Sequence, residues 1–375
     1  MTPKELAAHA HNHYGNPSES LYVIGVTGTN GKTTVTYLIG EVLKAAGFKP
    51  FVLGTFNSGS NDLSTPESVD ILRLMRTHLD QGGTHFVMEV TSEGIDQSRV
   101  AGIDFDIKLL TNITQDHLDY HKTFENYQAV KLGFMRDGAA KKIYPNHFKN
   151  EVIDFNTLLL GYFNLLNIKA AARILRYMSI NEDCIQRVLS SCPPPRGRLE
   201  KIEKDQDYMV IIDYAHTPDA MENVLVTVKR IASYQNGRLL VLFGCGGNRD
   251  QGKRSKMGKI ASNIADFLVI TDDNPRSENS LLIMGDIVKG ISGKFRDFIL
   301  VQDRKDAIKE IINRSQRNDV VILLGKGHET YQILALETIH FDDREQVSEA
   351  ITARLKNEAT VASISTAKNI DVSIK

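Results

Sequence analysis

Short, continuously apolar runs alternate with longer amphipathic stretches along most of the chain. The run at 21–27 is apolar, and the stretch at 32–46 that follows it repeats apolar residues at helical spacing. The same alternation returns in six further apolar runs, at 84–90, 107–111, 208–213, 239–243, 265–271 and 320–324. Strands of this kind, separated by helices, are typical of parallel sheets covered on both faces. The pattern therefore predicts an α/β fold of mostly parallel sheets, with the chemistry at the carboxyl ends of the strands.

Three successive prolines interrupt this alternation at 193–195. Proline cannot continue a helix and stiffens the chain, so the segment 190–198 around these prolines is the best candidate for a domain boundary. A length of 375 residues also suits two domains. We predict a first domain over 1–195 and a second over 196–357. Residues 358–375 are rich in Ser, Thr, Ala and Lys without apolar periodicity, which predicts a flexible tail.

Charge and composition exclude several classes of protein. The 45 Lys and Arg nearly balance the 46 Asp and Glu, so the net charge of -1 gives no bulk field for nucleic acid or anionic lipid. No apolar run approaches the roughly 18 residues that span a bilayer, and the N-terminus has no hydrophobic signal segment. We expect a cytoplasmic protein that binds no nucleic acid and does not insert into a membrane. Cys184, Cys192 and Cys245 lack zinc spacing and are an odd number, which favours buried thiols.

A glycine-rich turn lies between the first apolar run and the first helical stretch. It reads Gly25-Val26-Thr27-Gly28-Thr29-Asn30-Gly31-Lys32-Thr33-Thr34. Glycines let successive N–H groups face an anion, the helix N-terminus adds its positive end, a lysine supplies a point charge, and a threonine hydroxyl can reach Mg²⁺. The general Walker pattern would have glycine at position 26, and a purely structural turn is the alternative. We assign nucleotide binding to Gly28, Thr29, Asn30, Gly31, Lys32, Thr33 and Thr34.

Two further stretches carry candidate metal ligands. Glu89 stands near the end of the apolar run at 84–90, where a carboxylate can hold Mg²⁺ directly or through water. His117 lies in the polar stretch at 111–121 and could be a metal ligand or a proton carrier. The alternatives are a solvated strand end for Glu89, and for the second stretch a helix capped by Asp116 with histidines that merely pack.

These motifs together resemble the central domain of Mur ligases, the ATP-dependent enzymes that add amino acids to the peptidoglycan precursor. The resemblance rests on the turn at 28–34 and on the segments 88–92, 116–121 and 125–131, and it is greatest for the MurE subfamily, the tripeptide synthetases. It implies a phosphate-loop ATPase domain with a mostly parallel sheet, followed by a Rossmann-like α/β domain. It also implies that Lys131 is carbamylated and binds Mg²⁺. Without the resemblance, Lys131 would be a solvated lysine on a helix.

The resemblance extends over the second half of the chain. It implies that Asn164 and Asn167 contact adenine, that Arg198 lies at the interdomain segment about which the domains close, that Asp213 binds ribose, and that His216 lies by the nucleotide. The loops at 244–250, 273–276 and 325–329 follow apolar runs and correspond to the loops that bind the incoming amino acid. Further substrate-binding residues implied in the first domain are Thr65, Pro66, Thr91, Ser92 and Arg99.

The three loops contain the charges that an amino acid with two charged ends requires. A guanidinium at Arg276 would hold a side-chain carboxylate through two hydrogen bonds, Arg249 could hold a second carboxylate, and Glu329 suits a distal ammonium. Asp273-Asn274-Pro275-Arg276 is the version that the family associates with meso-diaminopimelate, and lysine-adding members lack its arginine. We therefore predict diaminopimelate as the amino acid, with Arg249, Asp273, Asn274, Arg276, Gly325 and Glu329 binding it.

Three departures from the family concern the acceptor. The usual N-terminal domain that binds the uridine nucleotide is expected to be absent, several strands are expected to be missing between Lys131 and Leu160, and Glu93 stands where the family has histidine. The acceptor could be a smaller or differently carried glutamyl or muramyl peptide, or a partner subunit could hold the uridine end. A fragment or a decayed paralogue is the remaining alternative.

The resemblance implies an ADP-forming ligase that uses ATP and Mg²⁺ to activate an acceptor carboxylate as an acyl phosphate and then joins it to an amine. Lys32, Glu89, His117, Lys131, Arg198 and His216 are the expected catalytic residues, and Thr33, Glu89, His117 and Lys131 the expected metal-side residues. A folylpolyglutamate-type ligase is one alternative, disfavoured by the loops at 273–276 and 325–329. A nucleotide-binding scaffold without ligase activity is the other.

Overall fold

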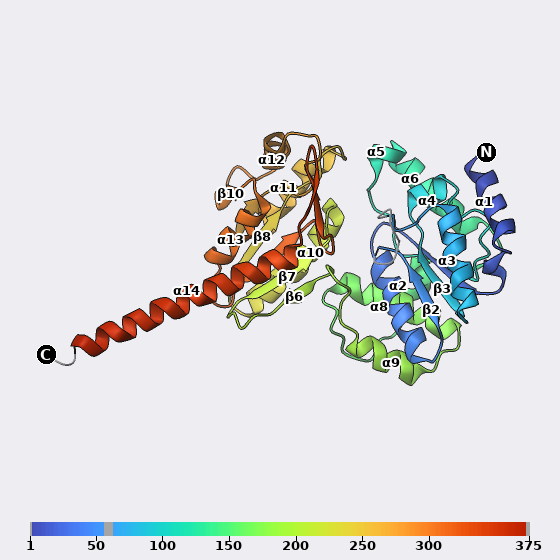
Figure 1. Cartoon of the computed structure of the whole chain (residues 1–375), viewed down its shortest axis with the longest axis horizontal. Coiled ribbons are helices and arrows are strands. Elements are labelled where there is room, and N and C mark those ends of the chain that lie inside the picture. The colour runs from blue at the N-terminus through green and yellow to red at the C-terminus, as the bar shows by residue number, and fades with distance from the viewer. Residues whose placement is uncertain (1, 56–62, 373–375) are drawn as a thin grey trace. The chain divides into compact units, whose positions relative to one another are not determined.

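The computed structural model describes residues 2–55 and 63–372, with side chains described to residue 359. The chain divides into two compact units, Met1–Pro195 and Arg196–Lys375, which we call unit 1 and unit 2. Each unit is a sheet covered by helices (Figure 1).

Unit 1 is built on a five-stranded parallel sheet in the order β2-β3-β1-β4-β5. The strands are β1 (Tyr22–Thr27), β2 (Pro50–Leu53), β3 (His85–Glu89), β4 (Ile107–Leu110) and β5 (Lys141–Ile143). Its helices are α1 (Pro3–His13), η1 (Pro17–Glu19), α2 (Lys32–Ala45), α3 (Ser68–Asp80), α4 (Ser92–Asp96), α5 (Leu118–His121), α6 (Phe124–Arg136), α7 (Pro145–Phe148), α8 (Tyr162–Tyr177) and α9 (Glu182–Ser191).

Both faces of this sheet are buried, which is why its strands are apolar throughout. Helices α2, α8 and α9 cover one face, where Ile24 and Val26 of β1 point. Helices α1, α3 and α6 cover the other face, where Val23 of β1 and Phe86 of β3 point. Alternate residues of one strand therefore enter different cores, as the period of a strand requires.

Unit 2 has a six-stranded sheet in the order β10-β9-β8-β11-β7-β6, parallel except for the edge pair β6 and β7. The strands are β6 (Glu200–Ile202), β7 (Met209–Asp213), β8 (Leu239–Phe243), β9 (Phe267–Ile270), β10 (Phe298–Leu300) and β11 (Val320–Leu324), and β12 (Tyr331–Ile333) with β13 (Thr338–His340) forms a separate antiparallel hairpin. The helices are α10 (Pro218–Tyr234), α11 (Gly252–Ile264), α12 (Ser280–Val288), α13 (Arg304–Arg314) and α14 (Asp343–Val372). Helices α13 and α14 pack on one face of the sheet.

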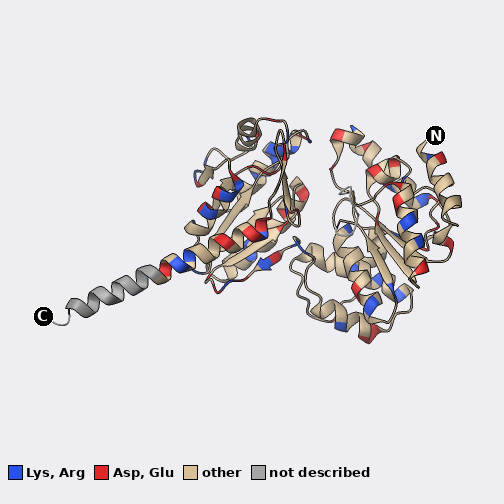
Figure 2. Cartoon of the chain, viewed as in Figure 1, with Lys and Arg blue, Asp and Glu red and all other residues tan. Residues whose placement is uncertain are grey.

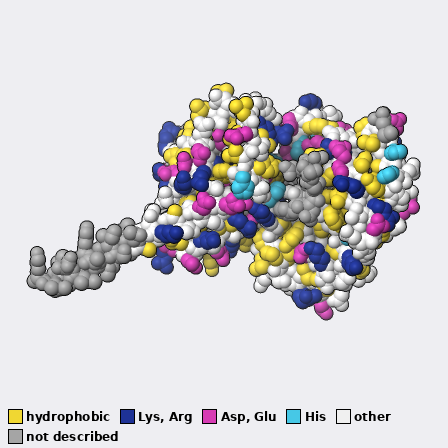
Figure 3. All heavy atoms as spheres, viewed as in Figure 1, with side chains coloured by type: hydrophobic (Ala, Val, Ile, Leu, Met, Phe, Trp, Pro, Cys, Tyr) yellow, Lys and Arg dark blue, Asp and Glu magenta, His cyan; other side chains and the backbone are white. Residues whose placement is uncertain are grey.

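The predicted mostly parallel α/β fold is confirmed, because every apolar run named above contains a strand of one of the two sheets. Basic and acidic residues are interspersed along the ribbons of both units in Figure 2, and their side chains are interspersed on the face drawn in Figure 3. Among the described residues, no helix is both long enough and apolar enough to cross a membrane.

The backbone of α14 stays helical to Val372, through most of the segment 358–375 for which a flexible tail is predicted (Figure 1). Val347, Ile351 and Leu355 in the first half of α14 pack against the core of unit 2. A helix that is nucleated there can be extended at little cost, since each added residue gains a hydrogen bond without a new nucleus. Residues 373–375 of the predicted tail lie outside the described residues.

Candidate active site

The phosphate loop joins β1 to α2, as its sequence predicts, and two of its glycines adopt backbone conformations that disfavour a side chain. Gly28 has φ +143° and Gly31 has φ +90°, which side-chain-bearing residues rarely adopt. A Cβ atom on Gly28 would lie 1.9 Å from the hydroxyl of Thr111, and one on Gly31 would lie 2.3 Å from Oδ1 of Asn167. The loop is therefore pressed against both the end of β4 and helix α8.

The loop amides divide into two groups. The N–H of Thr29 donates to the carbonyl of Asn112 (3.0 Å), and the N–H of Asn30 donates to Oδ1 of the same residue (2.9 Å). The amides of residues 32–34 open α2, where a helix has no internal acceptor for them. The amides at the start of α2 are therefore the ones open to an anion, while the backbone amides of Thr29 and Asn30 hold the loop in shape, and nucleotide binding by these two residues stays a prediction.

The side chain of Lys32, which supplies the positive charge of the phosphate loop, folds back onto the loop. Its Nζ donates to the carbonyls of Gly28 (2.9 Å) and Thr29 (2.8 Å). The ammonium is therefore already at the loop, where an entering phosphate would meet it.

Thr33 and Glu89 meet beside the loop because β1 and β3 are neighbours in parallel register, with Val26 opposite Glu89. The Thr33 hydroxyl donates to Oε2 of Glu89 (3.0 Å), and the N–H of Thr55 donates to Oε1 (2.8 Å). Glu89 is only 2% exposed. A hydroxyl and a buried carboxylate next to a phosphate site are the hard oxygen ligands that Mg²⁺ takes together with substrate phosphates. These two residues fit magnesium.

Lys131 of α6 is 1% exposed, so it is not the solvated lysine that its sequence position alone would suggest. Its Nζ donates to the carbonyl of Gly28 (3.0 Å) and lies 4.9 Å from the ring centre of Tyr127. Burial, aided by the nearby charge of Lys32, lowers the pKa of the Lys131 amine well below its ordinary value. An uncharged amine is a nucleophile, so the site favours the form that can accept CO₂ as a carbamate.

His117 stands between two carboxylates at the start of α5. Its Nδ1 lies 2.7 Å from Oε1 of Glu93, and its Nε2 lies 3.3 Å from Oδ2 of Asp116. Burial opposes the charged ring, but the hydrogen bond to Glu93 and the charge of Asp116 outweigh it and raise the pKa of His117. To serve as the predicted metal ligand, the ring would have to give up one of these contacts and its proton, because an imidazolium has no lone pair to offer.

The predicted substrate residues of unit 1 come together at the end of β3. The Thr65 hydroxyl donates to the carbonyl of Glu89 (2.9 Å) and accepts the N–H of Thr91 (3.0 Å), and Arg99 donates to the carbonyl of Thr65 (2.8 Å). Pro66 and Ser92 are buried beside them. These contacts fix the backbone that carries Glu89.

Asn164 and Asn167 lie on the first turns of α8. Asn167 Nδ2 donates to Oδ1 of Asn164 (3.1 Å), and both side chains are buried. Because Asn167 also lies against Gly31, the pair borders the phosphate loop.

A second group of predicted nucleotide residues lies at the end of β7 in unit 2. Asp213 accepts the N–H groups of Leu199 and Ala215, both at 2.8 Å. Burial raises the pKa of its carboxyl, and Arg198 and the two amides oppose that rise. The guanidinium of Arg198 lies over the ring of Tyr214, with 4.6 Å between them.

Tyr214 also brings two histidines together. Its ring centre lies 4.6 Å from that of His216 and 4.8 Å from that of His328. Nδ1 of His216 is 2.8 Å from the carbonyl of Tyr214. Burial, together with the charge of Arg198, lowers the pKa of His328 to about 3, so this ring is neutral at physiological pH.

The three predicted amino-acid loops follow β8, β9 and β11, which are neighbours in the sheet of unit 2. Arg276 has φ +53° and donates to the carbonyl of Gly247 (3.1 Å). Burial lowers the pKa of Arg276, and Arg249 nearby lowers it further. Two cations that repel each other at one place would be stabilised by a carboxylate.

The opposite charge lies on the third loop. Nδ2 of Asn274 donates to Oε2 of Glu329 (2.9 Å), and a Cβ on Gly325 would lie 2.3 Å from Oδ2 of Asp273. The structure therefore brings together Arg249, Asp273, Asn274, Arg276, Gly325 and Glu329 from three separate stretches of sequence.

Known proteins that resemble this chain also have two domains that match its two units. A model of the Mur ligase middle domain matches residues 26–144, and a model of the Mur ligase glutamate ligase domain matches residues 197–327. A UDP-N-acetylmuramoyl-L-alanyl-D-glutamate–2,6-diaminopimelate ligase from Clostridium botulinum is 37% identical over 399 residues, with 93% of this chain and 81% of the relative covered. The chain belongs to the Mur ligase family.

Solved structures of Mur ligases are also similar in fold to this chain. One of a UDP-N-acetylmuramoyl-L-alanyl-D-glutamate–2,6-diaminopimelate ligase is 30% identical, with a TM-score of 0.56 over 89% of this chain and 79% of the other. The MurF ligase of Thermotoga maritima in complex with ADP is 17% identical, with a TM-score of 0.67 over 95% and 84% of the two chains. At that identity the second match bears on the fold alone.

The alignment with the Clostridium Mur ligase also contains gaps. It is 399 positions long, whereas 93% of 375 residues is about 349 residues, so about 50 positions lie opposite gaps in this chain. Between residues 149 and 161 the described chain forms neither helix nor strand. A shortened region between Lys131 and Leu160 remains a prediction.

Several residues that shape the site of this Mur ligase were not predicted from its sequence. Asn112 holds the phosphate loop, Tyr127 faces Thr29 and Lys131, and Tyr214 with His328 completes the group at the end of β7. All four lie in or next to the motifs described above. Asn112, Tyr214 and His328 follow strands, whereas Tyr127 lies within helix α6, so the available signal was a polar or aromatic residue beside a motif residue.

Proposed function

We propose that this Mur ligase chain is an ADP-forming ligase that uses ATP and Mg²⁺ to join diaminopimelate to the carboxyl group of a muramyl or glutamyl peptide. The similarity to diaminopimelate ligases over 93% of the chain is the observation that carries the proposal. The Arg249, Arg276 and Glu329 charges support the choice of amino acid. A ligase that consumes ATP would work in the cytoplasm.

The proposed reaction has two steps. An oxygen of the acceptor carboxylate attacks the γ-phosphorus of ATP, the bond from that phosphorus to the bridging oxygen breaks, and ADP leaves. The amino group of diaminopimelate then attacks the carbonyl carbon of the acyl phosphate, phosphate leaves, and the nitrogen loses a proton as the amide forms. Both steps bring negative groups together, so the task of the protein is electrostatic.

Different residues of unit 1 would bind the phosphates, the adenine and the magnesium ion. Lys32 and the amides at the start of α2 would bind the phosphates, and Asn164 and Asn167 would border the adenine side. Thr33 and Glu89 would hold magnesium, joined by Lys131 if its amine carries a carbamate. When bound, the ion supplies positive charge that offsets the repulsion between acceptor and nucleotide.

The activity can be tested by following ADP release from the purified chain with ATP, Mg²⁺ and diaminopimelate. We expect release that depends on both the amino acid and the acceptor. UDP-muramoyl dipeptide and the same peptide without uridine, each with and without candidate partner subunits, would identify the acceptor. If ADP formation never depends on the amino acid while ATP still binds, the chain is a nucleotide-binding scaffold and the proposal is wrong.

Selection of diaminopimelate is tested at Arg276. We expect Arg276→Ala to lower kcat/KM for diaminopimelate by roughly 10- to 100-fold, because a hydrogen bond to a charged group contributes about 1.5–3 kcal/mol. Lysine, which lacks the second carboxylate, should be affected much less. Arg296→Ala is the control, since Arg296 is exposed on the same unit. Unchanged selectivity in Arg276→Ala would contradict the assignment.

A further inference from the structure

Among the described residues of unit 2, three cationic side chains are completely buried, and two of them are paired with carboxylates. Arg254 donates to both oxygens of Glu278 at 2.7 Å, and Arg304 donates to both oxygens of Asp343 at 2.8 and 2.7 Å. Lys326 is 0% exposed but lies 3.4 Å from its only carboxylate partner among the described residues, Glu329. Burial of an ammonium group costs free energy, so the contacts of the Lys326 ammonium should show which neighbouring groups it stabilises.

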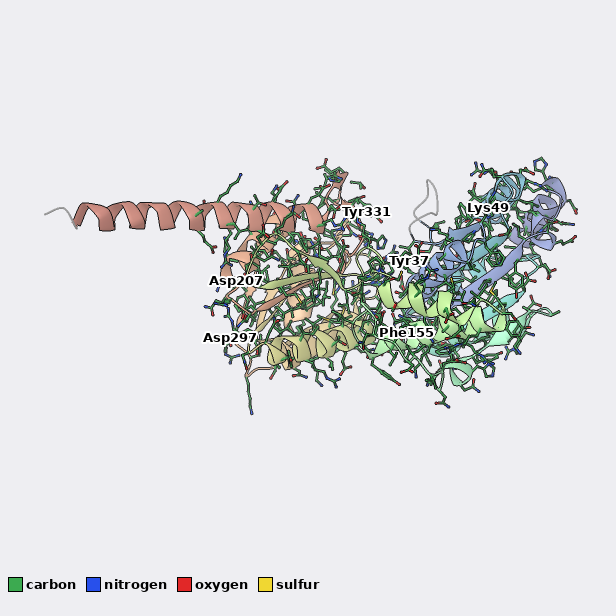
Figure 4. The ribbon with its side chains drawn as sticks, turned by 90° about the horizontal axis from the view of Figure 1, so that it is seen from below. Tyr37, Lys49, Phe155, Asp207, Asp297 and Tyr331 are labelled. Atoms are coloured by element: carbon green, nitrogen blue, oxygen red, sulfur yellow. The ribbon has the colours of Figure 1, made fainter. Side chains whose placement is uncertain are left out.

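The shorter hydrogen bonds of Lys326 go to neutral oxygens. Its Nζ donates to the carbonyl of Tyr331 (2.7 Å) and to Oδ1 of Asn274 (3.0 Å). Tyr331, labelled in Figure 4, is the first residue of β12. With Glu329 as the third acceptor, all three N–H donors of the ammonium are used. One buried cation thus joins the loop after β9, the loop after β11 and the hairpin.

This arrangement determines which way the Asn274 amide faces. Oδ1 of Asn274 accepts hydrogen bonds from Nζ of Lys326 and from the N–H of Ile333, both at 3.0 Å. Two donors on one atom identify it as the oxygen, so the NH₂ group must face the other way. There it donates to Oε2 of Glu329 at 2.9 Å.

The carboxylate of Glu329 is consequently held through one of its two oxygens, Oε2. Among the described residues, the hydrogen bonds to its carboxylate, from Asn274 and Lys326, all go to Oε2. Burial and the charge of Asp273 raise the pKa of Glu329, and Lys326 opposes that rise. Lys326 therefore both orients the carboxylate and favours its charged form.

We infer that Lys326 is a positioning residue for amino-acid selection, which orients Asn274 and Glu329 so that Oε1 of Glu329 meets the distal ammonium of the incoming amino acid. The inference rests on the proposed function. A positioning role differs from a purely structural role, because loss of Lys326 should then weaken recognition of the distal ammonium and leave the rest of the amino acid unaffected.

The test compares diaminopimelate with 2-aminopimelate, which keeps both carboxylates and lacks the distal ammonium. For the wild-type chain we expect a preference for diaminopimelate of roughly 10- to 100-fold in kcat/KM, as a charged hydrogen bond would contribute. Lys326→Met should abolish most of this preference, chiefly by raising KM for diaminopimelate, with KM for ATP within about twofold of wild type. Lys326→Gln, which keeps N–H donors without the charge, is a second variant with the same expectation.

Two controls separate positioning from loss of structure. Ile308→Ala removes buried side-chain volume from α13 and should lower the melting temperature without changing the preference. Glu329→Gln should lose the preference, and Lys326→Met combined with Glu329→Gln should lose no more than Glu329→Gln alone, because both act on one contact.

The outcomes distinguish the inference from the proposed function. If wild type forms no ADP in response to diaminopimelate, the proposed function is wrong. If wild type is active and either Lys326 variant keeps the preference, or loses activity equally with both amino acids, the inference is overturned. Additive losses in the double variant would overturn it as well.

Discussion

At the scale of the residue, burial decides what several charged groups of this Mur ligase can do. Lys131 belongs to a helix whose sequence alone suggests a solvated lysine, yet its amine lies against the carbonyl of Gly28 with a lowered pKa. The same burial gives His328 a neutral ring. Neither pKa follows from the residue type, because each is shifted mainly by burial, in which neighbouring elements exclude water from the side chain.

We expect Lys131→Ala to lower turnover by about 100-fold or more, as loss of one preorganised electrostatic contact does in other enzymes. If Lys131 acts as a carbamate, a short carboxylic acid added to the assay should partly restore ADP formation by supplying the missing carboxylate. Lys122→Ala, which alters a more exposed lysine between α5 and α6, is the control. Absence of rescue would weaken the carbamate assignment and leave the role of Lys32 untouched.

His328 should make the stability of the chain depend on pH. Between about pH 3 and pH 6.5 the unfolded chain binds a proton at this histidine and the folded chain does not, so stability rises with pH across that window. Above about pH 6.5 His328 no longer lowers the free energy of unfolding. As the pH falls below that value, it lowers this free energy by at most about 1.4 kcal/mol per pH unit. Chemical denaturation at several pH values should show a shallower dependence for His328→Gln, and equal slopes would contradict the assigned pKa.

At the scale of the element, the strand, glycine turn and helix at 22–45 were predictable from local sequence. The apolar run, the two glycines and the helical spacing all act over a few residues. What the turn contacts was not predictable, since Thr111, Asn112 and Asn167 arrive from β4 and α8. The short strands β5, β6, β10, β12 and β13 have three residues each and were missed, because three residues carry no usable periodicity.

Gly31→Ala tests whether the turn tolerates a side chain. A left-handed conformation costs an alanine roughly 1–2 kcal/mol, and the added Cβ would press on Asn167. We expect nucleotide affinity, measured by calorimetry, to fall about tenfold or more. Gly285→Ala is the matched control, because no atom lies within 4 Å of the Cβ it would add in α12, and it should stabilise the chain by about 0.5–1 kcal/mol. Unchanged affinity in Gly31→Ala would show that the turn adapts.

At the scale of the whole molecule, the chain consists of two α/β units with separate cores, each with its polar residues after the strands. Helix α14 closes the second core with Val347, Ile351 and Leu355. Arg354 adds hydrogen bonds to the carbonyl and hydroxyl of Ser315, at 2.9 and 2.8 Å. The described packing of α14 therefore lies within its first half.

Truncation after Glu358 should change the melting temperature by no more than about 1–2 °C, because it keeps these contacts. Truncation after Glu349 removes the buried Ile351 and the partly buried Leu355 and should lower the melting temperature by about 5 °C or more, because one large buried aliphatic side chain contributes about 2–5 kcal/mol. Differential scanning calorimetry of the two shortened chains measures both. A large loss after the first truncation would assign a structural role to the segment that the sequence predicts as a tail.

Local sequence was sufficient for the longer strands that the apolar runs predict, for the phosphate loop and for the loops that carry Arg249, Arg276 and Glu329, because apolar runs and glycine turns act between near neighbours. Only the tertiary structure placed Glu93 beside His117, buried Lys131 under the phosphate loop and made Lys326 the link between Asn274 and Glu329. Those residues are far apart in the chain or face inward for reasons of packing. Their pairing depends on which strand ends become neighbours, and that is settled when the sheets assemble.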